Sequence, residues 1–314
     1  MGDLHVWAPE GVGEITEGDD LAAVLLAAID DLRDGDVLVV TSKAVSKAEG
    51  RVRPGTRDDW LAGETTRLVA RRGPTRIVRN RLGLTMAAAG IDNSNVEAGS
   101  VVLLPEDPDR SARELREAVA GRRDVNVGVV VTDTAGRAWR DGQTDIAIGA
   151  AGLVVAESFA GRVDAHGNEL AVTAPAVADE LASAAELAQG KLGGRPCAVV
   201  RGRADLVLPT GEHGTGAAAL IRPDGADLFG WGAREAVIRA VAGAAADRGP
   251  FGSPVSAEEL ADALHDAGLA ARVTHADGVT ADGSRADAVR IVAFAHGWEV
   301  DGSDTDLRLR PVSP

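Results

Sequence analysis

The stretch 125-VNVGVVVTDTAGRAWRDGQTDIAIGAAGLVVA-156 contains two apolar runs, at 125–132 and 152–156, with no helical pattern between them. Short valine-rich runs that are bounded by glycine turns are typical of buried strands. Strands that follow one another without a helix between them do not form the repeated units of a regular doubly wound sheet. The stretch therefore predicts an α+β fold with mixed or antiparallel sheets and flanking helices.

The rest of the chain alternates between helical and strand-like patterns around this stretch. Further strands are expected at 37–41, 76–79, 100–104 and 197–201. Helices are expected at 21–32, 58–72, 110–120 and 176–189. Asp109 stands where the N-cap of the third of these helices belongs.

A composition break at 248–254 (RGPFGSP) divides the chain into a main domain, 1–247, and a small C-terminal α/β extension, 254–314. The extension contains an expected helix at 256–267 and two strand-like segments, ARVTHAD (271–277) and DAVRIVAFA (287–295). Residues 251–314 contain 11 acidic residues against five arginines, so this part carries a negative charge. The sequence gives the extension no identifiable role.

Composition excludes several classes of function. A net charge of −15 disfavours non-specific binding to nucleic acid or to an anionic membrane. No apolar run reaches the roughly 18 residues that span a bilayer, and the N-terminus lacks a signal-peptide pattern, so a cytoplasmic protein is expected. The single cysteine, Cys197, excludes an intramolecular disulfide framework and a cysteine-cluster metal site.

Lysine is scarce, because 33 basic residues include only Lys43, Lys47 and Lys191. Where almost every cation is arginine, a retained lysine hints at a compact charge that a planar guanidinium cannot replace, although chance retention is the alternative. Two of the lysines lie in TSKAVSK (41–47), directly after the expected strand 37–41. Their ammonium groups, with the hydroxyls of Ser42 and Ser46, could form a phosphate-binding cradle.

The end of the apolar run at 129–132 carries the strongest chemical signal. Asp133 and Thr134 follow this strand, and a carboxylate beside a hydroxyl suits Mg²⁺ or Mn²⁺. Arg137 and Arg140 lie just beyond and could neutralise a phosphoryl group or hold a substrate carboxylate. The alternative is an ordinary turn with two surface arginines.

A second polar turn, GIDNSNVEAG (90–99), could supply another carboxylate, Asp92, to a two-metal site, or could have a purely conformational role. GEHGTG (211–216) has no dinucleotide-binding context, and by itself it is typical of a flexible loop. No P-loop signature, GxxxxGK[ST], is present in the sequence.

These segments, in this order, resemble the coenzyme F420-0:L-glutamate ligase family, the gamma-glutamyl ligases of deazaflavin biosynthesis. The resemblance covers roughly residues 6–240 and is closest to the N-terminal part of the two-domain actinobacterial enzymes. It is carried by LRDGDVLVVTSKAVSKAEGRV, NRLGLTMAAAGIDNSNV, LLPEDPDRSA, VVTDTAGRAWRDGQTDIAIGAAGL, GNELAVTAPAVADELASAAEL and AVVRG.

The resemblance implies a ligase that uses GTP to phosphorylate the lactyl carboxylate of coenzyme F420-0. The amine of L-glutamate would then attack the acyl phosphate to form an amide, with further γ-linked glutamates left open. The family also implies two divalent ions, Mg²⁺ or Mn²⁺, together with K⁺, and an unusual α+β fold in an intertwined homodimer. Residues 251–314 are too short for the flavin-binding second domain of mycobacterial relatives, whose activity is expected to be missing.

The family's functional residues can be carried over to matching positions of this chain. The resemblance implies metal ligands at Asp92, Asp133 and Thr134. It implies nucleotide contacts at Val12, Gly13, Glu14, Ile15, Ser42, Lys47 and Asn95. A late nucleotide and metal loop should fall near 211–215, where the ligand is Glu212, His213 or neither, with Gly214 and Thr215 beside the nucleotide.

Two alternatives to this function remain open at the level of sequence. An amide ligase of the same chemistry could act on another carboxylate metabolite. A non-catalytic nucleotide-binding sensor could use the same phosphate cradle, with the C-terminal extension contacting a partner.

Overall fold

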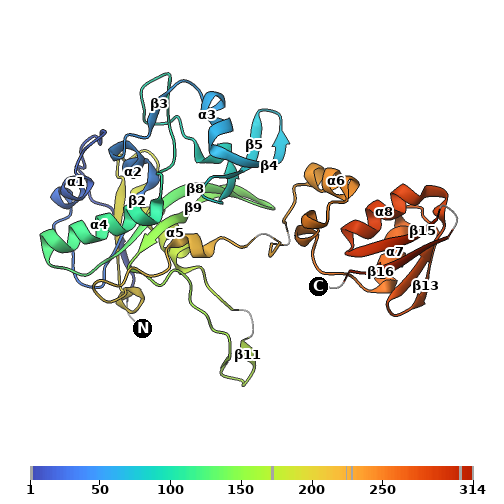
Figure 1. The fold of residues 1–314 in the computed structure, drawn as a ribbon. Coiled ribbons are helices and arrows are strands. Elements are labelled where there is room, and N and C mark those ends of the chain that lie inside the picture. The colour runs from blue at the N-terminus through green and yellow to red at the C-terminus, as the bar shows by residue number, and fades with distance from the viewer. Residues whose placement is uncertain (1–2, 171–172, 224, 228, 304–305, 313–314) are drawn as a thin grey trace. The chain divides into compact units, whose positions relative to one another are not determined.

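The computed structural model describes residues 3–170, 173–223, 225–227, 229–303 and 306–312 (Figure 1). The chain forms two compact units. The first contains the residues up to Leu68 and Gly73–Ile221, and the second contains Val69–Arg72 and the residues from Arg222 onward. Among the described residues, no helix combines the length and the apolar character that a membrane crossing requires.

A five-stranded mixed sheet forms the centre of the first unit. Its strand order is β1 (His5–Trp7), β12 (Cys197–Arg201), β2 (Val37–Thr41), β8 (Gly128–Arg137) and β9 (Arg140–Ala151). The pair β2 and β8 is parallel, and the other neighbouring pairs are antiparallel. This arrangement confirms the predicted α+β class.

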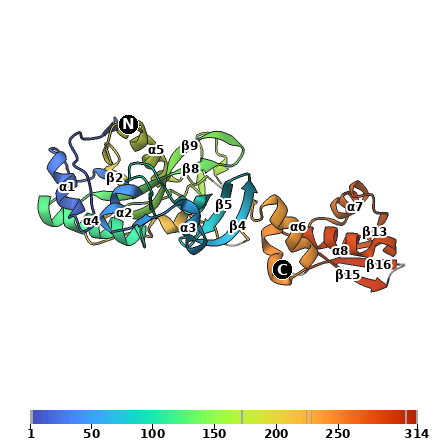
Figure 2. The same cartoon turned by 90° about the horizontal axis from the view of Figure 1, so that it is seen from above.

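Both faces of the sheet are covered, which explains why its central strands are continuous apolar runs. Leu38 and Val131 face one layer, formed by α1 (Leu21–Ala28), α2 (Ser42–Ala48) and α4 (Pro108–Arg123). Val39 and Val130 face the other, formed by α5 (Val177–Gln189). Figure 2 shows α5 on one side of the sheet, with α2 and α4 on the other.

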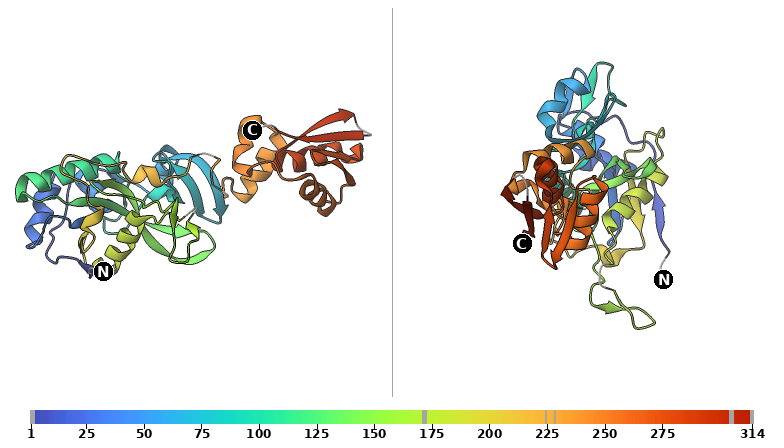
Figure 3. Two further views of the ribbon diagram at one scale, coloured as in Figure 1. Left: turned by 90° about the horizontal axis from the view of Figure 1, so that it is seen from below. Right: turned by 90° about the vertical axis from the view of Figure 1, so that its right-hand side faces the viewer.

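Smaller elements surround this sheet. A second layer of short strands beside α3 contains β3 (Val52–Pro54), α3 (Arg57–Glu64), β4 (Thr65–Arg72), β5 (Thr75–Asn80), β6 (Thr85–Ala87) and β7 (Ser100–Val102). A small hairpin of β10 (Arg162–Val163) and β11 (Glu169–Leu170) extends away from the central sheet (Figure 3). Short 3₁₀ turns lie at Ala88–Gly90, Ala204–Leu206 and Ala217–Leu220.

The second unit has a core of its own. Its antiparallel sheet has the order β13 (Ala271–His275), β14 (Gly278–Ala281), β16 (Asp306–Pro311) and β15 (Trp298–Ser303). Its helices are α6 (Ala233–Ala242), α7 (Ala257–Asp266) and α8 (Ala286–Ala295), with 3₁₀ turns at Ala245–Asp247, Gly249–Phe251 and Gly283–Arg285. Trp298 is fully buried in this core. The compact units divide at Ile221 and Arg222, and the domain boundary expected at 247–254 stays a prediction.

Several expected element boundaries are wrong. The helix expected at 58–72 ends at Glu64 and continues as strand β4, which begins with two threonines, residues favoured in strands. The segment expected as a second strand at 287–295 is helix α8, whose buried Val289 and Ala293 lie one helical turn apart.

The central stretch also differs from the expected pattern of two short strands. Instead, β8 and β9 form a long hairpin that passes through Gly136 and turns at residues 138–139. The strand expected at 152–156 is absent from the described structure, which has a single bridge at Leu153. Asp107, rather than Asp109, caps α4, while Asp109 accepts backbone hydrogen bonds from Ala150 and Ala217.

Arg116 on α4 connects three segments at the start of β8. Its side chain is buried, and it donates to the carbonyl oxygens of Val127, Glu212 and Leu208 at 2.9, 2.6 and 3.0 Å. Burial lowers the pKa of this guanidinium, although the carbonyl dipoles around it stabilise the charge. A Cβ atom on Gly152 would lie 2.0 Å from the Arg116 Nε atom, so no larger residue fits there.

We expect Arg116→Leu to lower the free energy of unfolding by at least about 3 kcal/mol, because several buried carbonyl oxygens would lose their donor. Chemical denaturation would measure the change. The exposed Arg113 on the same helix is the matched control, and Arg113→Leu should change stability by no more than about 0.5 kcal/mol. Equal effects of the two substitutions would contradict the structural role of Arg116.

Candidate functional site

The parallel register of β2 and β8 places Ser42 beside Asp133. Thr41 pairs with Thr132, so Ser42 and Asp133, the next residues along the two chains, lie side by side where β2 ends and β8 continues into its hairpin with β9. Ser42 begins helix α2, and its hydroxyl donates to Asp133 Oδ1 at 3.1 Å. The sequence-predicted cradle and the sequence-predicted metal carboxylate are therefore in direct contact.

Asp133 is surrounded by protein, and this changes its acidity. Burial raises the pKa of Asp133 to about 7, and the negative charges of Asp145 and Asp92 contribute to the increase. Hydrogen bonds from Ser42 and the Thr134 backbone act in the opposite direction. A carboxylate in such surroundings is ionised at neutral pH at an energetic cost that a bound cation would offset.

Asp92 reaches the same site from a different part of the chain. Its backbone pairs with Val102, which fixes the polar turn against the edge of β7. The Lys43 ammonium lies 2.6 Å from Asp92 Oδ2 and 2.7 Å from the Ser94 hydroxyl. Burial opposes ionisation of Asp92, but Lys43 and Ser94 hold its pKa below the ordinary value. Ser42 and Lys43 are neighbours in α2, so Asp133 and Asp92 are held by the side chains of adjacent residues. The charge of Asp92 also contributes to the raised pKa of Asp133.

Lys47 and the N-terminal loop form a further part of this region. The Lys47 ammonium lies 2.5 Å from Glu14 Oε1, and little of its side chain is exposed. In the same loop Ile15 is buried in the core and Val12 packs against it, whereas Gly13 is exposed. The structure thus brings the loop at 12–15 to the end of α2, and the nucleotide contacts expected there stay predictions.

The remaining residues of the polar turn and of α2 differ in their access to a ligand. Asn95 is exposed in the turn that contains Asp92 and has a left-handed backbone with φ +54°. Ser46 is 1% exposed. The expectation that its hydroxyl belongs to the phosphate cradle is therefore wrong.

Thr134 points away from Asp133, because successive residues of a strand face opposite sides of the sheet. The Thr134 hydroxyl donates to Asp145 Oδ1 at 2.8 Å and accepts from Lys191 at 2.9 Å. Asp145 also accepts from Thr132 at 2.9 Å. The assignment of the Thr134 side chain as a metal ligand stays a prediction, because its hydroxyl contacts Asp145 and Lys191 in the described structure.

Asp145 and Lys191 were not predicted as site residues. Asp145 is buried among apolar strand residues, a pattern that signals a specific polar role. Lys191 follows α5 and is the third of the rare lysines, so the count that pointed to Lys43 and Lys47 could have included it.

Arg137 and Arg140 lie opposite each other at the exposed tip of the β8–β9 hairpin. The described partner of Arg137 is the carbonyl oxygen of Asp141, at 3.1 Å. The two arginines are thus on the same hairpin as Asp133, but no contact joins them to it in the described structure. Their role in orienting substrate stays a prediction.

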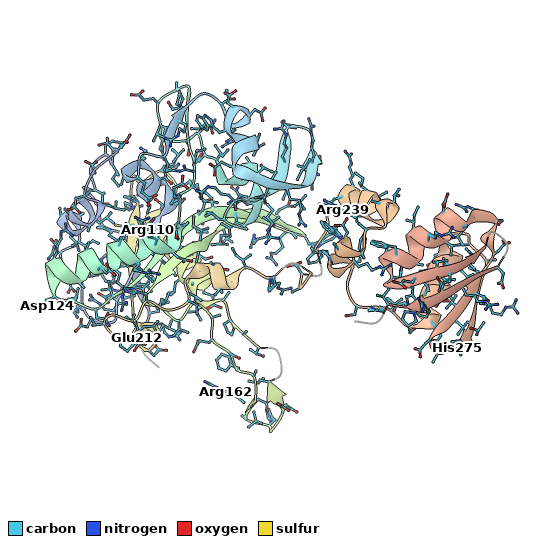
Figure 4. All side chains as sticks on the ribbon, viewed as in Figure 1. Arg110, Asp124, Arg162, Glu212, Arg239 and His275 are labelled. Carbon is cyan, nitrogen blue, oxygen red and sulfur yellow. The ribbon has the colours of Figure 1, made fainter. Side chains whose placement is uncertain are left out.

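The late loop lies at the other end of the central strands. The Gly152 amide donates to the carbonyl oxygen of His213, and the carbonyl oxygen of Glu212 accepts from Arg116, which also binds Val127 beside the start of β8. Figure 4 shows Glu212 below helix α4. Asp133 is five residues from Gly128, the first residue of β8, which corresponds to about 16 Å at the usual rise of a strand. Within one chain the structure does not bring Glu212, Gly214 and Thr215 to Asp133, so their assignment stays a prediction.

The donor set around Asp133 fits a divalent cation that also binds substrate oxygens. Asp92 and Asp133 supply carboxylates and Ser42 a hydroxyl, the hard oxygen donors that Mg²⁺ and Mn²⁺ prefer. In the part of the chain that the structure describes, no group of three or more His, Cys, Asp or Glu side chains could hold a metal ion alone. Mg²⁺ is commonly bound in this way, through one or two carboxylates together with phosphate oxygens.

We expect Asp133→Asn to stabilise the metal-free protein relative to wild type, progressively as the pH rises from about 4 to 7. The native pKa of about 7 exceeds the ordinary value of 3.8, so the native state retains a proton that the unfolded chain releases between these values. Wild-type protein therefore loses stability with rising pH across this window, whereas the neutral asparagine does not titrate. Thermal unfolding in a chelating buffer would check this, and a pH-independent difference in Tm would contradict it.

Comparison with known proteins identifies the family to which this site belongs. The sequence model of the F420-0:gamma-glutamyl ligase family matches residues 11–57 and 60–202. The coenzyme F420:L-glutamate ligase of Archaeoglobus fulgidus is 41% identical over 219 residues, 63% of this chain and 88% of the relative. The Methanopyrus kandleri protein of the same name is 40% identical over 240 residues, 69% of this chain and 93% of the relative. The matched residues include Ser42, Asp92 and Asp133, and the chain belongs to the F420-0:gamma-glutamyl ligase family.

Proposed function

We propose that this protein is a GTP-dependent ligase that joins L-glutamate to the lactyl carboxylate of coenzyme F420-0. The observation that carries the proposal is the convergence of Asp92 and Asp133 beside Ser42 and Lys43 in a member of this family. The names of the relatives supply the substrate pair, and the oxygen donors and ammonium groups of this chain suit a nucleotide triphosphate with divalent ions.

Asp92 and Asp133 would hold the divalent ions, Mg²⁺ or Mn²⁺, which neutralise the charge of the transferring phosphoryl group. Lys47 and Ser42 would bind phosphate oxygens, with Glu14 holding the Lys47 ammonium in place. K⁺ as a further ion and a homodimeric assembly belong to the same proposal on family resemblance.

The proposed reaction has two steps. The substrate carboxylate attacks the γ-phosphorus of GTP, a new P–O bond forms, and GDP leaves. The amine of glutamate then attacks the acyl carbon, the C–N bond forms, and phosphate leaves with the electrons of the C–O bond. Overall the ammonium group gives up two protons, of which one is carried by hydrogen phosphate and one is released. Catalysis by this chain is mainly positioning and charge neutralisation.

We expect Asp133→Ala to reduce GTP-dependent glutamylation by at least about 100-fold, because a lost metal ligand removes several kcal/mol of transition-state stabilisation. Mass spectrometry of the deazaflavin product after a timed reaction with GTP, Mn²⁺ and L-glutamate would measure the rate. The control is Asp266→Asn, an exposed carboxylate on α7, which should keep the wild-type rate within about twofold. Near-normal turnover of Asp133→Ala would refute the metal assignment.

Removal of divalent ions provides an independent test. Dialysis against a chelator should abolish product formation, and titration with Mn²⁺ should restore it. The two carboxylates and the phosphates are all negatively charged, and the divalent ions supply the positive charge that offsets them. Activity that survives complete metal removal would contradict the proposed role of Asp92 and Asp133.

The two remaining functions predict different products. A ligase with another carboxylate acceptor would form no glutamylated F420-0 but would release phosphate with its own substrate. A nucleotide-binding sensor would bind GTP tightly and release no phosphate with any acceptor. Offering several acceptors with L-glutamate and weighing the products separates these functions from the proposed one.

A further inference from the structure

The first unit contains a cavity of about 640 Å³ that none of the site assignments uses. Its walls come from the start of α3, from β5 and from the turn that leads into β7. Leu61 and Val101 are buried apolar residues of this wall and belong to one hydrophobic cluster, so the cavity rests on a packed base. Its volume is in the range of small-molecule sites, about 300–1,000 Å³.

Charged residues of both signs line this cavity. Arg57 and Arg76 are its two cations, and Asp58 and Glu97 are its acidic residues. The Arg76 guanidinium pairs with Asp58 at 2.8 Å. Arg57 is the first residue of α3, where reciprocal hydrogen bonds between Thr56 and Asp59 fix the helix start. Arg57 is therefore attached to an ordered backbone.

The cavity adjoins the candidate metal site through Arg57. The Arg57 guanidinium lies 3.7 Å from Asp92 Oδ1, and Asn93, the neighbour of Asp92, also lines the cavity. Asp92 therefore lies between two cations of different origin: Lys43 on the side of the phosphate cradle and Arg57 on the side of the cavity. A ligand in the cavity would have its reactive end close to the phosphoryl group bound at Asp92.

We propose that this cavity is the subsite for the amine-bearing substrate, L-glutamate, with Arg57 and Arg76 holding its carboxylates. The inference rests on the proposed ligase function and adds to it where the attacking amine is bound. Guanidinium groups pair with carboxylates through two parallel hydrogen bonds, and Glu97 offers an opposite charge to the ammonium group.

The other substrates suit this cavity less well. A triphosphate needs an excess of positive charge, whereas the two arginines are matched by two acidic residues. A tricyclic deazaflavin would favour aromatic partners, and none of the lining residues that the structure describes is aromatic. A small molecule with both carboxylates and an ammonium group matches the lining.

The test replaces Arg76 by glutamine in the full chain, because Arg57 also pairs with Asp92 and would disturb the metal site. Arg76→Gln should raise the KM for L-glutamate by at least about tenfold, with kcat at saturating glutamate and the KM for GTP changed by less than about threefold. Folding should be preserved, since the Asp58 partner is largely exposed and such pairs contribute little stability. Arg113→Gln, at an exposed position on α4, is the control and should keep every constant.

Equilibrium dialysis with radiolabelled L-glutamate, Mn²⁺ and a non-hydrolysable GTP analogue gives a second readout, and Arg76→Gln should bind at least about tenfold more weakly than wild type. If wild type forms glutamylated product and Arg76→Gln retains the wild-type KM and affinity for glutamate, the subsite is wrong and the proposed function stands. If wild type forms no glutamylated product with any supply of GTP and metal, the proposed function fails and this inference fails with it.

Discussion

The parallel pairing of β2 and β8 is the constraint on which the candidate site depends. Thr41 and Thr132 are partners in this register, so Ser42 and Asp133 follow them side by side and meet through a hydrogen bond. Valine side chains on both faces of the two strands are buried in separate cores. A slip by one residue would move these valines to the wrong faces, so the apolar packing that stabilises the sheet also fixes the geometry of the site.

The balance of charges around Asp92 and Asp133 differs between the two carboxylates. Asp92 and Asp133 come from segments far apart in the sequence, and the charge of Asp92 adds to the cost of ionising Asp133. Lys43 and Arg57 offset the charge of Asp92 from two sides. Asp133 accepts hydrogen bonds only from neutral groups, the Ser42 hydroxyl and the Thr134 backbone amide, among the contacts that affect its pKa. Its raised pKa therefore marks a position where an added cation would stabilise the ionised carboxylate. Proximity of two carboxylates with unequal compensation is a common arrangement at functional sites.

The same alternation that fixes the core separates neighbouring polar residues. Asp133 faces α2, whereas Thr134 faces the layer of α5 and contacts Asp145 and Lys191. The continuation of β8 to Arg137 carries the two arginines of the motif to an exposed hairpin tip. A compact sequence motif is thus distributed over two faces and one end of a long hairpin, and its residues cannot all have the same role within one chain.

Sequence determined the α+β class and the strands at 37–41 and 197–201, since apolar runs are a local property. It also singled out Ser42, Lys47, Asp92 and Asp133 by their residue chemistry and by family resemblance, and their roles stay predictions. It failed where the outcome depended on distant partners. The segment at 65–72 is a strand because it is part of a three-stranded sheet with β5 and β6, and 287–295 is a helix because one of its faces packs in the core around Trp298. The separation of Glu212 from Asp133, and the proximity of Arg57 to Asp92, were decided by tertiary structure, because the distance between residues remote in sequence is set by how the sheet and its covering helices pack.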